Sequence, residues 1–315
     1  MMRVIESLDG IDPADFAEGS SVAIGKFDGI HLGHRAILTR ARDSARSSGR
    51  ASVVVTFANH PLSHLRPEAC PLPLTSPEQR IEAFAELGID VCVMLDFDEA
   101  LASIPAEKFV SDVLVRRLGA REIVMGADFR FGHRGAGDAD LLRTLGERYG
   151  FVADAVEWVG DGSSGPVSSS RIREAIAIGD VESATRMLGR EPAVRGEVVH
   201  GDARGRELGF PTANLGGRIE GLVPADGVYA GWAVLGGSRL PAAISVGNNP
   251  TFTPDAQSRV EAFLLDFDRN IYGEPIEIRF AHRLRGTERF ASLEALIQQM
   301  DADVVRTREL LGMVN

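Results

Sequence analysis

The sequence predicts an α/β domain followed by a β domain: a doubly wound parallel sheet, then a small antiparallel β-barrel with a C-terminal helix. In the first half, short apolar runs alternate with helical segments, which is typical of a parallel sheet with helices on both faces. From about Arg195, glycines become dense and strand-like segments follow one another without helices between them. We place the boundary near residues 190–192, so that the domains span residues 1–188 and 189–315.

The composition predicts a soluble globular protein. The chain has 315 residues, of which 44% are hydrophobic and 25% charged, enough for about two domains. The net charge of −11 disfavours nucleic acid as a partner, because an acidic surface repels the phosphate backbone. We expect no membrane partner and no signal peptide, since no apolar run is long enough. Cys70 and Cys92 form no CxxC pair, which argues against zinc and disulfides and favours the cytoplasm.

The elements follow from the apolar pattern. In the first half the expected strands are 22–27, 53–57, 91–95, 123–125 and 151–159, and the expected helices are 34–47, 76–88, 106–118 and 139–149. The second helix has a capping box, Ser76 to Gln79. In the second half the expected strands are 195–200, 228–235, 242–246, 259–267 and 276–284. The last helix carries one apolar stripe, made of Leu293, Leu296, Ile297, Met300 and Val304.

A histidine motif, GKFDGIHLGH at residues 25–34, lies where the first strand meets the first helix. At that edge of a parallel sheet ligands collect. Gly33 lets a nucleotide approach the backbone, and His31 and His34 can donate to the phosphates of a nucleotide at a helix N-terminus. The alternative is a plain turn with two surface histidines.

A second polar cluster, SSSRIR at residues 168–173, follows the last strand and opens a helix. Hydroxyl groups and an arginine at a helix start can hold phosphates, although the same residues can be a simple serine cap with basic neighbours. Two further residues also follow strands. Asp128, in GADFRFG, could meet an adenine or ribose together with the aromatic rings, or its loop could plug the core. His60 could face the pocket or occupy a turn.

The most informative stretch of the second half is HGDARGRELGFPTAN at residues 200–214. Its glycines, Gly201, Gly205 and Gly209, allow a loop to wrap phosphates with backbone N–H groups, although it is not a Walker A loop. Thr212 and Asn214 are two residues apart, so they share a face in an extended chain, and their oxygens suit Mg²⁺. A glycine-rich barrel connection without a ligand is the alternative.

Glu261 lies in VEAFLLDF, where alternation puts it on the face of Phe263, Leu265 and Phe267. A carboxylate on such an apolar face is unusual, and desolvation would raise its pKa toward that of a general base. The other face is apolar too, so the pattern does not settle its exposure. The alternative is a structural carboxylate paired with Arg279.

The N-terminal motifs together resemble the nucleotidyltransferase family that makes FAD. The matching stretches are GKFDGIHLGH, TFANHP, GADFRFG and SSSRIR, over about residues 22–188. The resemblance implies a Rossmann-like sheet, transfer of the AMP moiety of ATP to FMN without a covalent enzyme intermediate, and Mg²⁺ on the departing pyrophosphate. It also implies catalytic roles for His31 and His34, and flavin or phosphate binding by His60. The ATP-binding residues that it implies are Gly25, Phe27, Asp28, Gly33, Asp128, Ser169, Ser170 and Arg173.

Two departures from that family pattern stand out. Ala58 and Asn59 replace an acidic residue and a proline, which puts the role of that loop in question. Ser170 replaces a threonine but keeps the hydroxyl group.

The C-terminal half resembles riboflavin kinase over about residues 193–311, through HGDARGRELGFPTANL, GVYAGW, ISVGNNPTF and VEAFLLDF. The resemblance implies ATP binding by Gly201, Arg204, Gly205, Gly209, Thr212 and Asn214. It further implies Mg²⁺ on Thr212 and Asn214, and activation of the ribityl hydroxyl by Glu261. The chain departs from the family at Ala262 and Phe263, which leaves the base in place.

The two halves in this order resemble the bacterial bifunctional riboflavin kinase/FAD synthetase family. We therefore expect riboflavin, FMN and ATP as small-molecule partners, and a monomer or weak homo-oligomer. Three alternatives remain: one inactive half, a flavin sensor without turnover, and a tRNA-charging relative. Intact motifs in both halves disfavour the first two, and the lack of a basic stretch disfavours the third.

Overall fold

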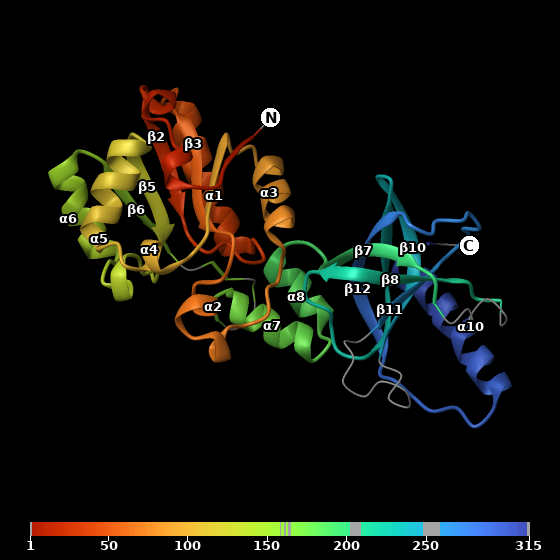
Figure 1. The fold of residues 1–315 in the computed structure, drawn as a ribbon. Helices are drawn as coiled ribbons and strands as arrows, with labels where there is room; N and C mark the ends of the chain where they lie inside the picture. Colours follow the sequence, from red (N-terminus) through yellow and green to blue (C-terminus); the bar gives the residue numbers. More distant parts are fainter. Residues whose placement is uncertain are drawn as a thin grey trace. The chain divides into compact units, whose positions relative to one another are not determined.

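The computed structural model describes residues 2–157, 159–160, 162, 165–201, 209–247 and 259–313. The chain divides into two compact units, Met1–Ser168 and Ser169–Asn315 (Figure 1). Each unit has a hydrophobic core of its own. Among the described residues, no helix combines the length and the apolar character that crossing a bilayer requires.

Unit 1 contains a six-stranded parallel sheet of order β1-β4-β3-β2-β5-β6. Its strands are β1 (Arg3–Ile5), β2 (Ser20–Ile24), β3 (Ala51–Phe57), β4 (Val91–Leu95), β5 (Ala120–Gly126) and β6 (Val152–Val156). The predicted parallel sheet is confirmed. β1 was not expected, because three residues are too few to produce a pattern. β2 ends at Ile24 rather than at residue 27, because Phe27 turns the backbone to a φ of 48°.

Helices cover both faces of this sheet, as the doubly wound prediction requires. The helices are α1 (Leu32–Ser47), α2 (Pro61–Leu65), α3 (Pro77–Glu86), α4 (Glu99–Ala102), α5 (Ala106–Lys108) and α6 (Ala139–Tyr149), and a π-helical segment, η4 (Phe109–Arg117), continues α5. Short 3-10 turns are η1 (Leu8–Gly10), η2 (Pro13–Phe16), η3 (Pro67–Ala69) and η5 (His133–Gly135). On one face Leu38 and Phe84 pack against Ala23, and on the other Leu114 and Leu142 belong to the main core. The predicted capping box holds: Ser76 accepts from the Gln79 amide, and Gln79 from the Ser76 amide.

The order of the strands fixes where a ligand can bind. The chain runs from β2 to β3 and β4 on one side, and then returns to place β5 on the other side of β2. In open α/β sheets the crevice at such a reversal, at the carboxyl ends of the strands, is where ligands bind. In unit 1 that point lies between β2 and β5.

A buried arginine closes this edge of the sheet. Arg80, on α3, is 5% exposed. Its Nη1 donates to the carbonyl oxygens of Phe57 (2.7 Å) and Lys26 (3.3 Å), and its Nη2 donates to that of Ala58 (2.8 Å). Phe57 is the last residue of β3, Ala58 follows it, and Lys26 follows β2, so these carbonyls lie at the carboxyl edge of the sheet; that of Lys26 also accepts from Thr56 Oγ1 (3.1 Å). The guanidinium therefore fixes the two segments that leave the carboxyl edge.

Unit 2 contains a closed barrel of order β10-β11-β8-β7-β12-β9, which confirms the predicted antiparallel barrel. Its strands are β7 (Ala193–Val199), β8 (Thr212–Glu220), β9 (Gly227–Leu235), β10 (Ser238–Gly247), β11 (Arg259–Leu264) and β12 (Pro275–Arg285). β8 was not among the expected strands, because its glycines Gly216 and Gly217 obscure the alternation.

Unit 2 also contains α7 (Ser169–Ala177) and α8 (Val181–Leu188). Val181 is fully buried within the core of the barrel unit, and Glu182 accepts from the backbone N–H of Arg283 on β12 (3.2 Å). Arg283 in turn donates to the carbonyl oxygen of Ile178 (2.6 Å). The two helices thus pack on the barrel, although the sequence assigned them to the first domain. The predicted boundary at 188/189 remains a prediction.

The C-terminal helix α10 (Leu293–Leu310) confirms the predicted terminal helix. Polar contacts also attach it to the barrel, which its apolar stripe did not suggest. Leu293 is 54% exposed, whereas Asp303 and Thr307 are buried. Arg285 of β12 donates from Nη2 to Asp303 (2.8 Å), and Gln299 donates to the same carboxylate (2.9 Å). A buried carboxylate needs such partners, so the ion pair anchors α10 to the barrel.

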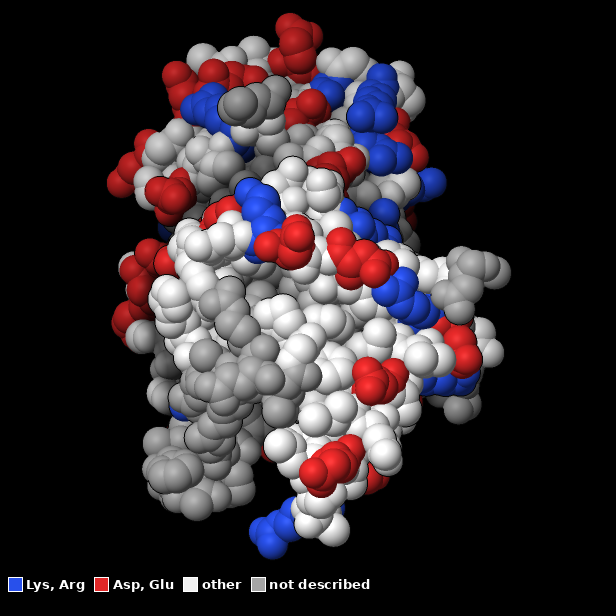
Figure 2. Space-filling view, turned by 90° about the vertical axis from the view of Figure 1, so that its right-hand side faces the viewer, with Lys and Arg blue, Asp and Glu red and all other residues white. Residues whose placement is uncertain are grey.

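Charges of both signs share the surface. Figure 2 shows Lys and Arg side chains interspersed with Asp and Glu over one face, without a continuous basic area among the coloured residues. Several are paired: Arg308 lies 2.6 Å from Asp266, and Arg269 lies 3.1 Å from Glu274. Such exposed pairs contribute little to stability.

We expect Arg80→Met to destabilise unit 1 by about 3 kcal/mol, because the change removes the guanidinium donors of the Phe57 and Ala58 carbonyl groups. Differential scanning calorimetry of the full chain measures the loss. Arg143→Met is the control, since Arg143 is exposed on α6 and forms a surface pair with Asp140, so a change within about 0.5 kcal/mol is expected. An equal loss of stability in the two variants would show that the buried contacts of Arg80 do not stabilise unit 1.

Candidate functional site

The two motif histidines lie together at the start of α1. His31 is the N-cap residue, and its Nδ1 accepts from the backbone N–H of His34 (3.3 Å). The two rings stack with centroids 3.6 Å apart and an interplanar angle of 15°. Because Nδ1 of neutral His31 is an acceptor, its proton lies on Nε2, which is then a donor. The prediction that both histidines gather at one helix N-terminus is confirmed.

His34 is held in its neutral form. Burial lowers its pKa well below 6.5, and His31 and Lys26 lower it further. Its Nδ1 is buried without a hydrogen-bond partner among the described residues. A neutral imidazole has one N–H group that can donate to a phosphate oxygen and one nitrogen that can accept.

The turn before these histidines is strained. Phe27 and Ile30 have φ angles of 48° and 40° and are fully buried. Residues that are not glycine cost about 1–3 kcal/mol each in this region, and such strain gathers at functional sites. Gly33 leaves the His31 ring room, because a Cβ there would lie 3.2 Å from it and the ring would have to move by a few tenths of an ångström.

Asp28 has a structural position within this turn. Its carboxylate accepts from the backbone N–H groups of Leu74 (3.0 Å) and Thr75 (3.2 Å). Asp28 therefore connects the motif to the segment that precedes α3. Its predicted contact with ATP stays a prediction.

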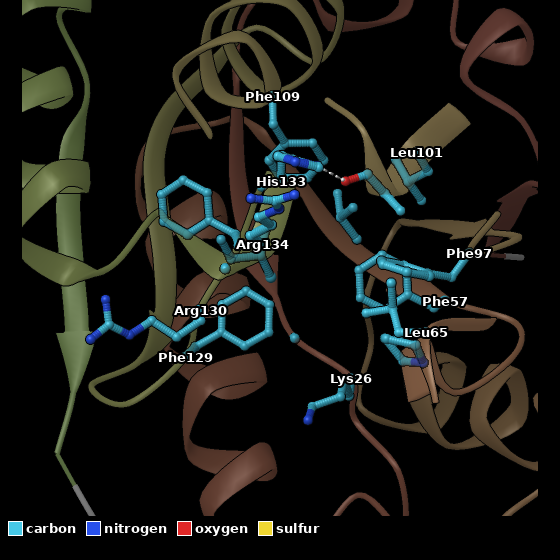
Figure 3. A pocket seen from close by; sticks show the side chains of 18 of the residues that line it. Lys26, Phe57, Leu65, Phe97, Leu101, Phe109, Phe129, Arg130, His133 and Arg134 are labelled. Atoms are coloured by element: carbon cyan, nitrogen blue, oxygen red, sulfur yellow. Dashed lines mark hydrogen bonds between the residues drawn. The ribbon is translucent and has the colours of Figure 1, made fainter. Parts of the chain in front are cut away.

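A cavity of about 350 Å³ opens beside the motif, at the reversal point of the sheet (Figure 3). Its walls come from the ends of β2 and β3, from α2, α4 and the start of η4, and from the segments that follow β4 and β5. Five aromatic residues give it an apolar character: Phe57, Phe97, Phe109, Phe129 and Phe131. Gly25 and Lys26 belong both to this wall and to the histidine motif. The volume and the aromatic walls fit a flat organic ring of drug-like size.

The two other predicted residues of this unit lie at the same carboxyl edge. His60 is the N-cap of α2, where its Nδ1 accepts from the Leu62 amide (3.1 Å), and α2 supplies Pro61 and Leu65 to the cavity wall. Asp128 follows β5 and is exposed, next to Phe129 in the wall. Phe129 and Phe131 of the GADFRFG loop both line the cavity, and both also contact the core of unit 1. The predicted contact of Asp128 with adenine or ribose stays a prediction.

Ser169, Ser170 and Arg173 begin α7 and belong to unit 2. Their predicted place beside His31 and His34 stays a prediction.

The second site is a strand pair in the barrel. Residues of β8 and β11 face each other in the order Glu261–Asn214, Ala262–Ala213 and Phe263–Thr212. The alanines point into the core, so Thr212, Asn214 and Glu261 share the other face. Thr212 donates from Oγ1 to Glu261 Oε2 at 3.4 Å. The expectation that Thr212 and Asn214 share a face is confirmed.

The surroundings of Glu261 differ from the predicted ones. β11 ends at Leu264, and Asp266 adopts a φ of 55°, so Leu265 and Phe267 do not continue the face of Glu261. Glu261 is half-buried. The alternative partner Arg279 donates instead to Glu277 (2.6 Å), which removes the structural pairing that the sequence had left open.

Glycines of the phosphate-loop candidate flank this pair. A Cβ on Gly201 would lie 2.5 Å from the Asn214 side chain, so this glycine is required for Asn214 to keep its position. Gly209 has a φ of 88° just before β8. Arg204 and Gly205 lie outside the described residues.

Oxygen ligands for Mg²⁺ are present at this face. Thr212 Oγ1 and the amide oxygen of Asn214 are hard donors, and the Glu261 carboxylate adds negative charge beside them. No group of three His, Cys, Asp or Glu side chains that could hold a metal occurs in the described part of the chain. The donor set thus suits a cation that also binds phosphate oxygens and water.

Sequence reasoning missed most of the cavity. Phe57, Phe97 and Phe109 are spread over fifty residues, and no local pattern connects them. Two of them could have been found from their place at the carboxyl ends of strands. Phe57 ends β3 and Phe97 follows β4, at the same edge of the sheet as the motif.

Comparison with known proteins matches both units. The FAD synthetase family model matches residues 14–171, and the riboflavin kinase model matches residues 188–311. A bifunctional riboflavin kinase/FMN adenylyltransferase of Pseudomonas fluorescens is 37% identical over 98% of both chains. The enzyme of the same name from Escherichia coli K12 is 35% identical over 99% of both.

A solved structure from Streptococcus pneumoniae, named as a macrolide-efflux protein, matches with a TM-score of 0.87 and 34% identity. The match covers 98% of this chain and 99% of that one. Full-length relatives and two family models in the same order lead to one assignment: the chain belongs to the bifunctional riboflavin kinase/FMN adenylyltransferase family.

Proposed function

We propose that this chain divides the two activities of its family between its two sites. The strand pair of β8 and β11 phosphorylates riboflavin with ATP, and the edge of the parallel sheet joins FMN to the AMP moiety of a second ATP, releasing pyrophosphate. The observation that carries the proposal is the presence, in one chain, of two separate phosphate-directed constellations. They are the stacked His31 and His34 at a helix N-terminus, and Glu261 beside Thr212 and Asn214.

In the kinase step Glu261 accepts the proton of the ribityl hydroxyl. The hydroxyl oxygen then bonds to the γ-phosphorus of ATP, and the bond from that phosphorus to the β-phosphate oxygen breaks, giving FMN and ADP. Thr212 and Asn214 would hold Mg²⁺, which would supply neutralising charge to the phosphates. The 3.4 Å contact between Thr212 and Glu261 supports this division of labour, because it places base and metal ligands on one face.

In the adenylyl step an FMN phosphate oxygen attacks the α-phosphorus of ATP. His31 and His34 donate to phosphate oxygens as the bond to pyrophosphate breaks, helped by the N-terminus of α1. No covalent intermediate is needed, so positioning and charge stabilisation provide the catalysis. Gly25, Phe27, Gly33 and Asp128 lie at the edge where ATP would bind, and we propose that Ser169, Ser170 and Arg173 contact the same nucleotide.

The aromatic cavity beside the motif is our candidate for the flavin ring. Its volume of about 350 Å³ is within the range of organic-ligand pockets. Lys26 joins the cavity wall to the histidine motif, so a ring in the cavity would direct its phosphate toward His31 and His34. His60 and the loop of Ala58 and Asn59 lie at the same edge.

The functional domains span residues 1–188 and 189–315. The chain works in the cytoplasm, where ATP is available and where Cys70 and Cys92 remain thiols, as they are in the structure. It acts as a monomer or a weak homo-oligomer.

The kinase role of Glu261 predicts a clean separation of the two activities. Glu261→Gln should reduce FMN formation from riboflavin by at least about 100-fold, because removal of a general base costs roughly 10²–10⁴ in rate. The same variant should still convert supplied FMN to FAD at the rate of the unaltered chain. Chromatography of riboflavin, FMN and FAD measures both steps, and normal phosphorylation by Glu261→Gln would contradict the assignment.

The histidine pair predicts the opposite separation. A chain with both His31→Ala and His34→Ala should form FMN from riboflavin and accumulate it, since the donors to the transferring phosphate are lost. The test is the FMN to FAD ratio after incubation with riboflavin, ATP and Mg²⁺. FAD formation at the unaltered rate would remove the histidines from the mechanism.

The lowered pKa of His34 predicts a pH effect on stability. In the unfolded chain this histidine binds a proton as the pH falls through about 6.5, whereas the folded chain resists protonation until a lower pH. The unfolded state therefore gains protons first, and unit 1 loses stability as the pH falls below 6.5. We expect His34→Gln to weaken this loss between pH 7 and 5. Calorimetry of both proteins checks it, and parallel pH profiles would contradict it.

A further inference from the structure

The charged side chains that line the cavity of unit 1 differ in whether they have an ion-pair partner. The guanidinium of Arg130 pairs with Asp138 (2.8 Å), and Glu99 faces His64 (3.2 Å). Among the residues that the structure describes, Lys26 and Arg134 have no ion-pair partner. Lys26 belongs to the histidine motif and is therefore at the phosphate end. Arg134 stands on the loop after β5, among the aromatic side chains (Figure 3).

The backbone of Arg134 is unusual. Its φ and ψ are 54° and 21°, the left-handed region, between Gly132 and Gly135 with φ angles of 72° and 64°. A glycine would occupy this position without strain, whereas an arginine does not. Backbone strain of this kind gathers at functional sites, and the side chain of Arg134, which is exposed, stands in the lining of the cavity.

We propose that Arg134 recognises the flavin ring by donating hydrogen bonds to the carbonyl-bearing pyrimidine edge of the isoalloxazine. This inference rests on the proposed function of the cavity and adds a specificity-determining residue to it. The ring is flat and apolar over most of its surface, but its pyrimidine edge carries carbonyl oxygens and acceptor nitrogens. An aromatic cavity alone would bury these acceptors without partners, which is costly.

A guanidinium is suited to this task. It presents five donors in a rigid plane, and it lies well against aromatic faces. A flat aromatic molecule without acceptors would bury the Arg134 cation unpaired, so the same residue that binds a flavin would reject such a molecule. The remaining cation, Lys26, would meet the phosphate at the other end of the ligand.

The decisive variant is Arg134→Gly, because it separates binding from folding. Glycine relieves the strained φ, so the melting temperature of unit 1 should stay unchanged or rise. The KM for FMN in adenylyl transfer should nevertheless increase roughly 10- to 100-fold, as expected for loss of a hydrogen bond to a charged group. Arg134→Asn, which also tolerates a left-handed backbone and removes the cation, should give the same increase.

A second measurement identifies which part of the flavin Arg134 contacts. Lumiflavin has the isoalloxazine ring but neither ribityl chain nor phosphate, and it should inhibit adenylyl transfer in competition with FMN. If Arg134 meets the ring, Arg134→Gly raises the Ki of lumiflavin by the same factor as the KM of FMN. If the KM rises and the Ki does not, Arg134 contacts the ribityl chain or the phosphate, and the proposal is wrong.

The full-length chain is used throughout, with FAD formation from supplied FMN as the readout, so that the kinase site does not contribute. Arg143→Gly on α6 would break a helix, so Arg143→Gln is the matched control, and its KM and Ki should equal those of the unaltered chain. If the unaltered chain is active and both Arg134 variants keep its KM and Ki, the role of Arg134 is wrong, whereas the proposed function still stands. An unaltered chain that forms no FAD contradicts the proposed function itself and this inference with it.

Discussion

The organisation of unit 1 depends on how the carboxyl ends of its parallel strands satisfy their backbone groups. A strand that ends leaves carbonyl oxygens without a ladder partner, and a site built there must satisfy them without blocking the ligand. Arg80 meets this requirement by donating to the carbonyl oxygens of Lys26, Phe57 and Ala58. Its contacts therefore fix two cavity-lining residues, Lys26 and Phe57, although Arg80 itself does not line the cavity.

The barrel solves a related problem differently. Its closed sheet leaves no strand edge, so its functional groups are side chains on the outer face of β8 and β11. Register alone places Asn214 opposite Glu261, and alternation turns Ala213 and Ala262 into the core. Gly201 then gives Asn214 room. Both sites thus present preformed polar groups, one from a helix N-terminus and one from a ladder of cross-strand pairs.

The fold could be predicted from the sequence because its signals are local. Buried β-branched runs, the capping box at Ser76 and the alternation along β12 each lie within a few residues. The histidine motif and the Thr212–Asn214 pair could be found for the same reason. The aromatic cavity and the Arg80 contacts could not, because they join residues that only the strand order brings together. The π-helical form of η4 and the extent of β8 also depend on packing.

The position of α7 and α8 has a consequence for anyone who dissects this protein. Their apolar residues, such as Val181, are buried against the barrel, and Arg283 ties β12 to Glu182 and Ile178. Cutting the chain at residue 188 would remove α7 and α8 from the barrel and expose the apolar surface that they cover. A fragment that starts at Ser169 would keep both helices, because α7 and α8 belong to unit 2. The stable fragment of the C-terminal half is therefore expected to start about twenty residues earlier than the β-domain motifs alone would suggest.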